Sequence, residues 1–219
     1  MSDNAFVHVR DLRVVFRRDG QTINAVNGVS FDVQKGEVMA LIGESGSGKS
    51  VTLRALMRLH PPGSSELSGT LRVGDDAVLT MSASQLRRYR GGRCAMIFQE
   101  PLLAFDPVYT VGQQIIEGLR RHEGLSRQAA RDRALEALRQ VRIPSPERRL
   151  DAYPHEMSGG MRQRAMIALA LSCNPQLLLA DEPTTALDAT VQIQILILLR
   201  EQQKQRGLSI VFVTHDIGA

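Results

Sequence analysis

A glycine-rich segment, Gly43-Glu-Ser-Gly-Ser-Gly-Lys-Ser50, stands between the apolar run Val38–Ile42 and a helix predicted over residues 50–59. An apolar strand without a polar face is typical of a parallel sheet that is buried on both sides. The segment fits the pattern G-x-x-x-x-G-K-[ST] at each fixed position. Its glycines allow backbone N–H groups to surround a phosphate, and the helix N-terminus adds partial positive charge. We therefore predict a nucleotide phosphate site rather than a chance glycine-rich turn.

The side chains of this loop have separate predicted roles. Lys49 is expected to reach the β- and γ-phosphates, and the Ser50 hydroxyl to bind Mg²⁺. The full set of residues predicted to contact the nucleotide here is Gly43, Glu44, Ser45, Gly46, Ser47, Gly48, Lys49 and Ser50.

A second apolar strand, predicted over residues 177–180, ends in two adjacent carboxylates, Asp181 and Glu182. Ligands of parallel sheets bind at the carboxyl ends of the strands. Asp181 is therefore predicted to hold Mg²⁺ through its water shell, and Glu182 to polarise a water for attack on the γ-phosphate. The alternative is that the acidic pair caps a helix or lies in a solvated loop. The phosphate loop in the same chain favours the Mg²⁺ and water roles over this alternative.

Strands and helices alternate along the chain, which favours an α/β fold. The strands expected to form an antiparallel piece are 5–9, 12–16 and 29–33, and buried strands are expected at 95–98 and 208–214. Helical periodicity covers residues 110–141, 160–173 and 191–206, with Ser126 as an N-cap and Gly207 as a C-cap. We predict a P-loop core with a parallel sheet, an N-terminal antiparallel β layer and a helical insertion.

Composition excludes several classes of protein. The 27 basic and 23 acidic residues leave a net charge of only +4, and 4% of residues are aromatic, so a stacking groove for nucleic acid is not expected. No apolar run reaches the roughly 18 to 20 residues that span a bilayer, and the N-terminus does not read as a signal peptide. Cys94 and Cys173 form no CxxC pair, which indicates free thiols in a reducing compartment.

The segment His155-Glu-Met-Ser-Gly-Gly-Met-Arg-Gln-Arg164 resembles the signature motif of ABC transporter ATPases. Ser158 can cap the helix that begins near Gly160, which makes a second anion site. The resemblance implies that Ser158, Gly159 and Gly160 bind the γ-phosphate of the nucleotide held by the opposite subunit. Met157 and Met161 replace the commoner Leu and Gln, outside the Ser-Gly-Gly core.

Further landmarks of the same family follow in order. Gln99, after a buried strand, resembles the Q-loop glutamine, which contacts Mg²⁺ and the attacking water. Ala186-Leu187-Asp188 resembles the D-loop, so Asp188 is expected at the dimer interface. His215 resembles the switch histidine, which contacts the γ-phosphate. Phe16 resembles the adenine-stacking aromatic, although Phe6 and Phe31 lie nearby and a core role is equally open.

The resemblance implies one ABC ATPase domain, with a core made of residues 1–98 and 163–219 and a helical insertion over 99–162. It also implies ATP and Mg²⁺ as cofactors, a second ATPase subunit, separate permease subunits and, indirectly, a solute-binding protein. The location would be cytoplasmic, on the inner face of the membrane. The segment Tyr153–Arg164 and the segment that begins Glu182-Pro-Thr-Thr-Ala-Leu-Asp resemble the peptide/nickel importer ATPases, of the oligopeptide, dipeptide and glutathione type.

Two alternatives remain open from the sequence. The first is a non-transport ABC ATPase of DNA repair or translation, although neither a coiled-coil or zinc-bearing insertion nor a second cassette is seen. The second is an inactive nucleotide-binding fragment, because members of the family normally continue past the switch histidine whereas this chain ends at Ala219. An open edge is then expected at the last strand.

Overall fold

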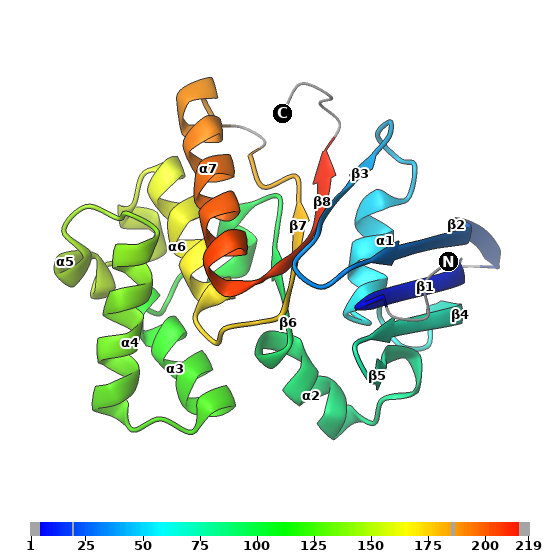
Figure 1. Cartoon of the computed structure of the whole chain (residues 1–219), viewed down its shortest axis with the longest axis horizontal. Coiled ribbons are helices and arrows are strands. Elements are labelled where there is room, and N and C mark those ends of the chain that lie inside the picture. Colours follow the sequence, from blue (N-terminus) through cyan, green and yellow to red (C-terminus); the bar gives the residue numbers. More distant parts are fainter. Residues whose placement is uncertain (1–4, 19, 185–186, 215–219) are drawn as a thin grey trace. The chain divides into compact units, whose positions relative to one another are not determined.

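The computed structural model describes residues 5–18, 20–184 and 187–214 (Figure 1). The chain divides into two compact units, one of residues 1–87 with 209–219 and one of residues 88–208. Helix α2 (Ala83–Gly92) spans the division along the chain and is interrupted by non-helical backbone at Arg90 and Gly91.

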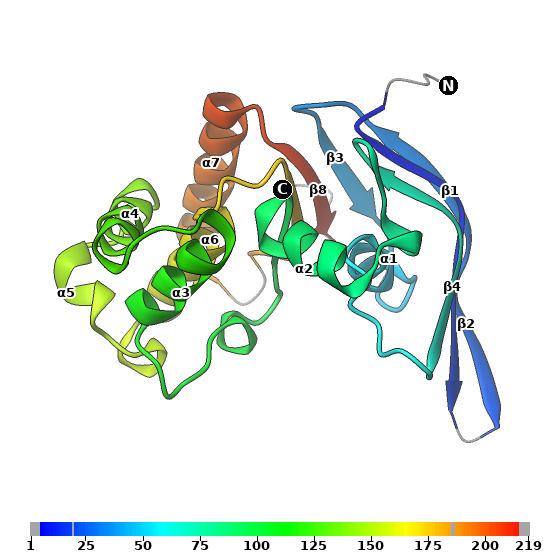
Figure 2. The same ribbon diagram turned by 90° about the horizontal axis from the view of Figure 1, so that it is seen from below.

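The first unit contains an antiparallel sheet with the strand order β2-β1-β4-β5. Its strands are β1 (Val7–Arg18), β2 (Gln21–Val33), β4 (Ser65–Val73) and β5 (Asp76–Ala77). Figure 2 shows β1, β2 and β4 side by side as a curved sheet, with α1 beside it. The antiparallel β layer predicted for the N-terminal part of the chain is therefore present.

A β-bulge in β1 explains why the segments expected as two separate strands, 5–9 and 12–16, form one. Pairing with β4 shifts between Arg10 and Arg13, so two residues of β1 oppose Gly69. Asp11 takes a positive φ of 45°, and its N–H donates to Ser30 Oγ at 2.9 Å. The extra residue shifts the alternation of buried and exposed side chains by one position. Val7 and Val9 are fully buried before the bulge, and Leu12 and Val14 are fully buried after it.

The first unit also holds the parallel pair of β3 (Val38–Ile42) and β8 (Ser209–Thr214), joined over five residue pairs. After β3 comes α1 (Lys49–Leu56), and a short 3₁₀ helix, Val78–Thr80, follows β5. Val38 and Ile42 are about half exposed, at 51% and 53%. The expectation that β3 is buried on both faces is therefore wrong, because burial depends on what covers a strand and not on its composition alone. The exposed apolar side chains lie on β3, whereas most of β8 is buried.

The second unit is built on the parallel strands β6 (Cys94–Ile97) and β7 (Leu177–Asp181), paired from Cys94 with Leu177 to Ile97 with Ala180. Every residue of both strands is buried, as the continuous apolar runs predict. Burial raises the pKa of the Cys94 thiol to about 12, and Cys173, also a free thiol, is half-buried.

Five α-helices of the described chain belong wholly to this unit. They are α3 (Val111–Glu123), α4 (Arg127–Gln140), α5 (Pro146–Leu150), α6 (Gly159–Leu171) and α7 (Ala189–Arg206), with short 3₁₀ helices at Pro101–Ala104 and Pro154–Glu156. Ser126 caps α4 by accepting from Ala129 N–H, and Gly207 ends α7 with a φ of 63°, as predicted for both. The α/β fold class expected from the sequence is confirmed. No helix in the described part of the chain combines the length and apolarity needed to cross a membrane.

The bulge generates a stability prediction at Gly69. Its φ is +100°, and an added Cβ would collide with the carbonyl oxygens of Arg10 and Asp11. We expect Gly69→Ala to lower the free energy of unfolding by about 2 to 4 kcal/mol, because backbone strain adds to overpacking. Gly63, with a φ of +90° and open space around the added Cβ, is the matched control. Gly63→Ala should cost only about 1 to 2 kcal/mol in urea denaturation, and equal losses would contradict the role given to the collision.

Candidate functional site

The glycine-rich loop connects β3 to the N-terminus of α1 and folds around the Lys49 ammonium. Nζ donates to the carbonyl oxygens of Gly43 and Glu44, both at 2.6 Å, and to Ser47 Oγ at 3.3 Å. Gly48 is the N-cap of α1 and offers no side-chain acceptor, and the first turn of the helix contains no acidic residue. The first N–H groups of a helix have no partner within it, so this uncapped end and Lys49 together favour an anion.

Glycine is required at Gly48 for two reasons. Its φ is 87°, in the left-handed region, and an added Cβ would lie 2.5 Å from the carbonyl oxygen of Ala25 on β2. Gly46 also has a positive φ, 79°, but faces open space. Both Gly46 and Gly48 are therefore needed for their positive φ angles, and of the two only Gly48 is also needed for the close contact with β2.

The acidic pair stands at the carboxyl end of β7, in the second unit. Asp181 is the last residue of the strand and is 2% exposed. Glu182 follows with a φ of 46°, which turns the chain out of the strand direction. Its Oε2 accepts from Gln99 Nε2 at 3.3 Å, so the structure brings together two residues that were predicted separately. Glu182 and Gln99 thus form a polar pair at the end of a buried strand.

The signature segment caps α6 as predicted. Ser158 Oγ accepts from the N–H of Met161 at 3.4 Å, and the Ser158 carbonyl oxygen accepts from Arg162 N–H at 2.9 Å. Ser158 and Gly159 are exposed, whereas Met157 is buried. The start of α6 therefore presents a serine and a glycine to solvent.

Helix α7 begins beside α6, and its N-cap is Asp188, whose Oδ1 accepts from Val191 N–H at 3.0 Å. An added Cβ on Gly160 would lie 3.3 Å from Val191 Cγ1, so the missing side chain allows the two helix starts to approach closely. Arg164 NH2 also donates to Gln194 Oε1 at 2.8 Å. Two of the predicted nucleotide-contact segments thus lie side by side within the second unit.

Gln163 is a structural residue of this site to which the sequence analysis gave no role. It is 2% exposed, and its Nε2 donates to the carbonyl oxygen of Pro183, the residue after Glu182. This bond ties α6 to the loop after β7. Helical periodicity could have predicted that Gln163 is buried, because it stands four residues before the apolar Ile167 and therefore on the same face of the helix.

Phe16, the residue predicted to stack on adenine, lies on β1 in the first unit. Phe16 is half-buried and packs edge-to-face against His60, with ring centroids 5.3 Å apart. The His60 ring contacts the Val51 carbonyl oxygen at 3.0 Å, and burial lowers its pKa. His215 and Ala186 lie outside the described residues.

The geometry supplies an uncapped helix N-terminus with a lysine in one unit, and a carboxylate–amide pair beside two capped helices in the other. A phosphate loop and an acidic strand end of this kind define a P-loop nucleotide-binding fold. The chain matches the family model described as ABC transporter over residues 26–185. It therefore belongs to the ABC transporter ATP-binding family, as the signature segment indicated.

Individual relatives agree with this assignment. The chain is 49% identical over 214 residues to the oligopeptide transport ATP-binding protein OppD of Bacillus subtilis, covering 97% of this chain and 60% of that protein. It is 49% identical over 224 residues to the glutathione import ATP-binding protein GsiA of Pectobacterium atrosepticum, covering 100% of this chain and 36% of that protein. The chain thus spans less than two thirds of the length of these relatives.

A solved structure matches the fold with a TM-score of 0.85 at 29% identity, covering 97% of this chain and 89% of the other. That structure is a dimeric post-hydrolysis state of an ATP-binding cassette bound to ADP and Pi.

The buried amide of Gln163 generates a prediction. Gln163→Leu keeps the size of the side chain but leaves the Pro183 carbonyl oxygen without its donor. We expect the free energy of unfolding to fall by about 1 to 3 kcal/mol, the usual cost of a buried unsatisfied group. Gln128→Leu is the control, because Gln128 is an exposed glutamine whose Nε2 donates to Asp132 Oδ1 at 3.0 Å. Equal stability of the two variants in urea denaturation would show that the bond to Pro183 is not needed.

Proposed function

We propose that this chain binds and hydrolyses ATP as the nucleotide-binding subunit of a membrane importer. The observation that carries the proposal is the Lys49 ammonium, held at the uncapped N-terminus of α1 by two carbonyl oxygens of its own loop. Phosphate oxygens are stronger acceptors than carbonyl oxygens, so they would replace these contacts when ATP binds. Family membership supports the same nucleotide.

Hydrolysis is assigned to Glu182, with Gln99 as its partner. A carboxylate can polarise the attacking water, and the Gln99 amide, 3.3 Å away, orients that carboxylate. His215 is kept as the proposed contact to the γ-phosphate on the sequence pattern alone. Most of the catalysis of phosphoryl transfer comes from position and charge, which is the kind of chemistry that these groups provide.

Mg²⁺ is proposed as the metal, with Asp181, Ser50 and Gln99 as its candidate partners. Among the described residues, no three His, Cys, Asp or Glu side chains gather as a dedicated metal site. This fits Mg²⁺, which is commonly held by one or two protein oxygens together with substrate phosphates and water. When bound, the ion would neutralise charge on the phosphates.

A second subunit is proposed to complete the nucleotide site. The exposed Ser158 and Gly159 at the start of α6 have free access to a ligand on another chain, and Asp188 caps the neighbouring helix. The dimeric cassette with ADP and Pi supports this arrangement, because it is similar to this chain in fold and sequence. Phe16 is retained as the candidate for stacking on adenine.

Permease subunits and a solute-binding protein are the remaining proposed partners, at the cytoplasmic face of the membrane. The names of the Bacillus and Pectobacterium relatives favour import of a peptide or a similar small molecule over a role in repair or translation.

Removal of the Lys49 ammonium tests nucleotide binding. We expect Lys49→Ala to weaken ATP binding by at least about tenfold, because charge-assisted hydrogen bonds to the phosphates are lost. The matched control is Lys35→Ala, since Lys35 is exposed and outside the loop. Titration of a fluorescent ATP analogue measures both. Undiminished binding by the Lys49 variant would overturn the phosphate-loop assignment.

Neutralisation of Glu182 separates hydrolysis from binding. Glu182→Gln keeps the size of the side chain and removes its charge, so ATP should still bind while the rate of phosphate release falls by about 10² to 10⁴-fold. Glu123→Gln, on the exposed end of α3, should hydrolyse ATP at the parent rate. The assays use this chain with Mg-ATP, alone and with permease-containing membranes. A Glu182→Gln protein with full activity would rule out Glu182 as the base.

A further inference from the structure

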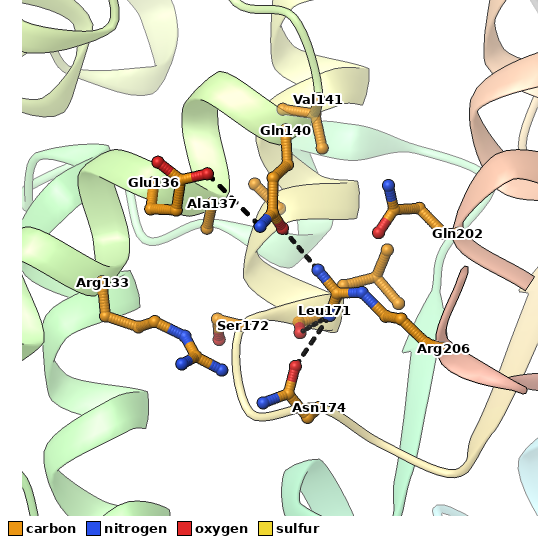
Figure 3. Close-up of a pocket in the computed structure, with 11 residues that line it drawn as sticks. Arg133, Glu136, Ala137, Gln140, Val141, Leu171, Ser172, Asn174, Gln202 and Arg206 are labelled. Atoms are coloured by element: carbon orange, nitrogen blue, oxygen red, sulfur yellow. Dashed lines mark hydrogen bonds between the residues drawn. The ribbon is translucent and has the colours of Figure 1, made fainter.

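A polar cavity of about 230 Å³ lies within the second unit, between α4 and the C-terminal ends of α6 and α7 (Figure 3). Its polar lining includes Arg133, Glu136, Gln140, Asn174, Gln202 and Arg206. None of these residues was assigned to the nucleotide site. The 18 residues of α7 measure about 27 Å, so the cavity lies far along this helix from the cap at Asp188.

Arg206 forms one wall and uses its guanidinium entirely on neutral acceptors. NH1 donates to the Leu171 carbonyl oxygen at 3.0 Å and to Asn174 Oδ1 at 2.9 Å, and NH2 donates to Gln140 Oε1 at 2.5 Å. Burial lowers the pKa of Arg206, and the nearby Arg133 guanidinium lowers it further. The Arg206 guanidinium is therefore held in place by neutral oxygens, and none of these acceptors is a carboxylate that would neutralise its charge.

Arg133 supplies a second guanidinium on the α4 side of the cavity. Within the described residues it has neither a hydrogen bond nor an ion pair. The one acidic side chain of the lining, Glu136, instead accepts from Gln140 at 3.4 Å and lies 3.8 Å from Arg139. The cavity consequently has an excess of positive charge and one guanidinium free to bind an anion.

Gln202 presents an acceptor from the opposite side. It is only 4% exposed, and its Oε1 finds no hydrogen-bond donor in the described part of the chain. Figure 3 shows its carboxamide directed toward the space that Gln140 and Arg206 border. A buried carbonyl oxygen without a donor is costly, so a group with N–H or O–H would be favoured at this point.

We propose that this cavity binds a small organic acid with one carboxylate and a hydrogen-bond donor, of the hydroxy-acid or amino-acid class. The carboxylate would contact Arg133, and the hydroxyl or ammonium would donate to Gln202 Oε1. Glu136 on the same lining disfavours a dianion, because it would repel the second charge. The volume lies below the roughly 300 to 1,000 Å³ of drug-sized pockets, which limits the ligand to a few heavy atoms.

Isothermal titration calorimetry with four probes tests this site. L-lactate and L-serine carry both required groups, propionate carries only the carboxylate, and ethanolamine carries only donors. We expect L-lactate and L-serine to bind with dissociation constants at least about tenfold lower than those of propionate and ethanolamine. Propionate lacks the donor for Gln202, and ethanolamine lacks the carboxylate for Arg133. Absence of binding by L-lactate and L-serine, or equal binding of all four probes, would overturn the proposal.

Variants locate the binding within the protein. Arg133→Gln removes the anion partner, Gln202→Leu removes the acceptor, and Gln202→Glu adds a charge that repels L-lactate but attracts the ammonium of L-serine. Arg133→Gln and Gln202→Leu should abolish the preference for L-lactate and L-serine, whereas Gln202→Glu should weaken the binding of L-lactate and spare that of L-serine. If one Gln202 variant fails to fold, the other still tests the acceptor. Arg139→Gln is the matched control, because Arg139 lies on the same helix but outside the cavity lining. Binding of L-lactate should survive Arg139→Gln. If it also survives both Arg133→Gln and Gln202→Glu, the ligand binds elsewhere and the proposed site is refuted.

Discussion

Complete burial of β6 and β7 is the constraint on which the acidic part of the site depends. Each residue of the two strands is enclosed, so a charged side chain is tolerated only where a strand ends. Asp181 occupies that last position, and the positive φ of Glu182 redirects the chain immediately afterwards. The Glu182 carboxylate is thereby placed directly at the end of a buried strand, and Gln99, just past the end of the neighbouring strand, donates to it there.

The signature helix α6 also connects neighbouring segments of the second unit. Gln163 holds the Pro183 carbonyl oxygen, Arg164 holds Gln194, and Gly160 permits contact with Val191. These contacts make α6, the acidic loop and the start of α7 one connected body. The backbone beside Glu182 is thereby joined to the signature helix by a buried hydrogen bond.

The sequence predicted the features that local chemistry decides. Ser126, Ser158 and Gly207 were placed correctly because caps depend on neighbouring backbone groups, and β7 because its apolar run is short and ends in acid. The bulge at Asp11 and the exposure of Val38 depend on partner strands, which one sequence does not specify. The contact of Gln163 with Pro183 also joins residues that are distant in sequence. The roles assigned to the individual site residues remain predictions, those of Phe16, Asp188 and His215 included.

The depth at which Cys94 is buried has a practical consequence. Burial raises the pKa of this thiol to about 12 and shields it from solvent, so alkylating reagents should bypass Cys94 in the native state. Once β6 separates from its neighbours, the thiol regains ordinary reactivity. Alkylation of Cys94 would therefore report unfolding of the second unit, whereas the half-buried Cys173, just after the end of α6, is the more accessible of the two thiols.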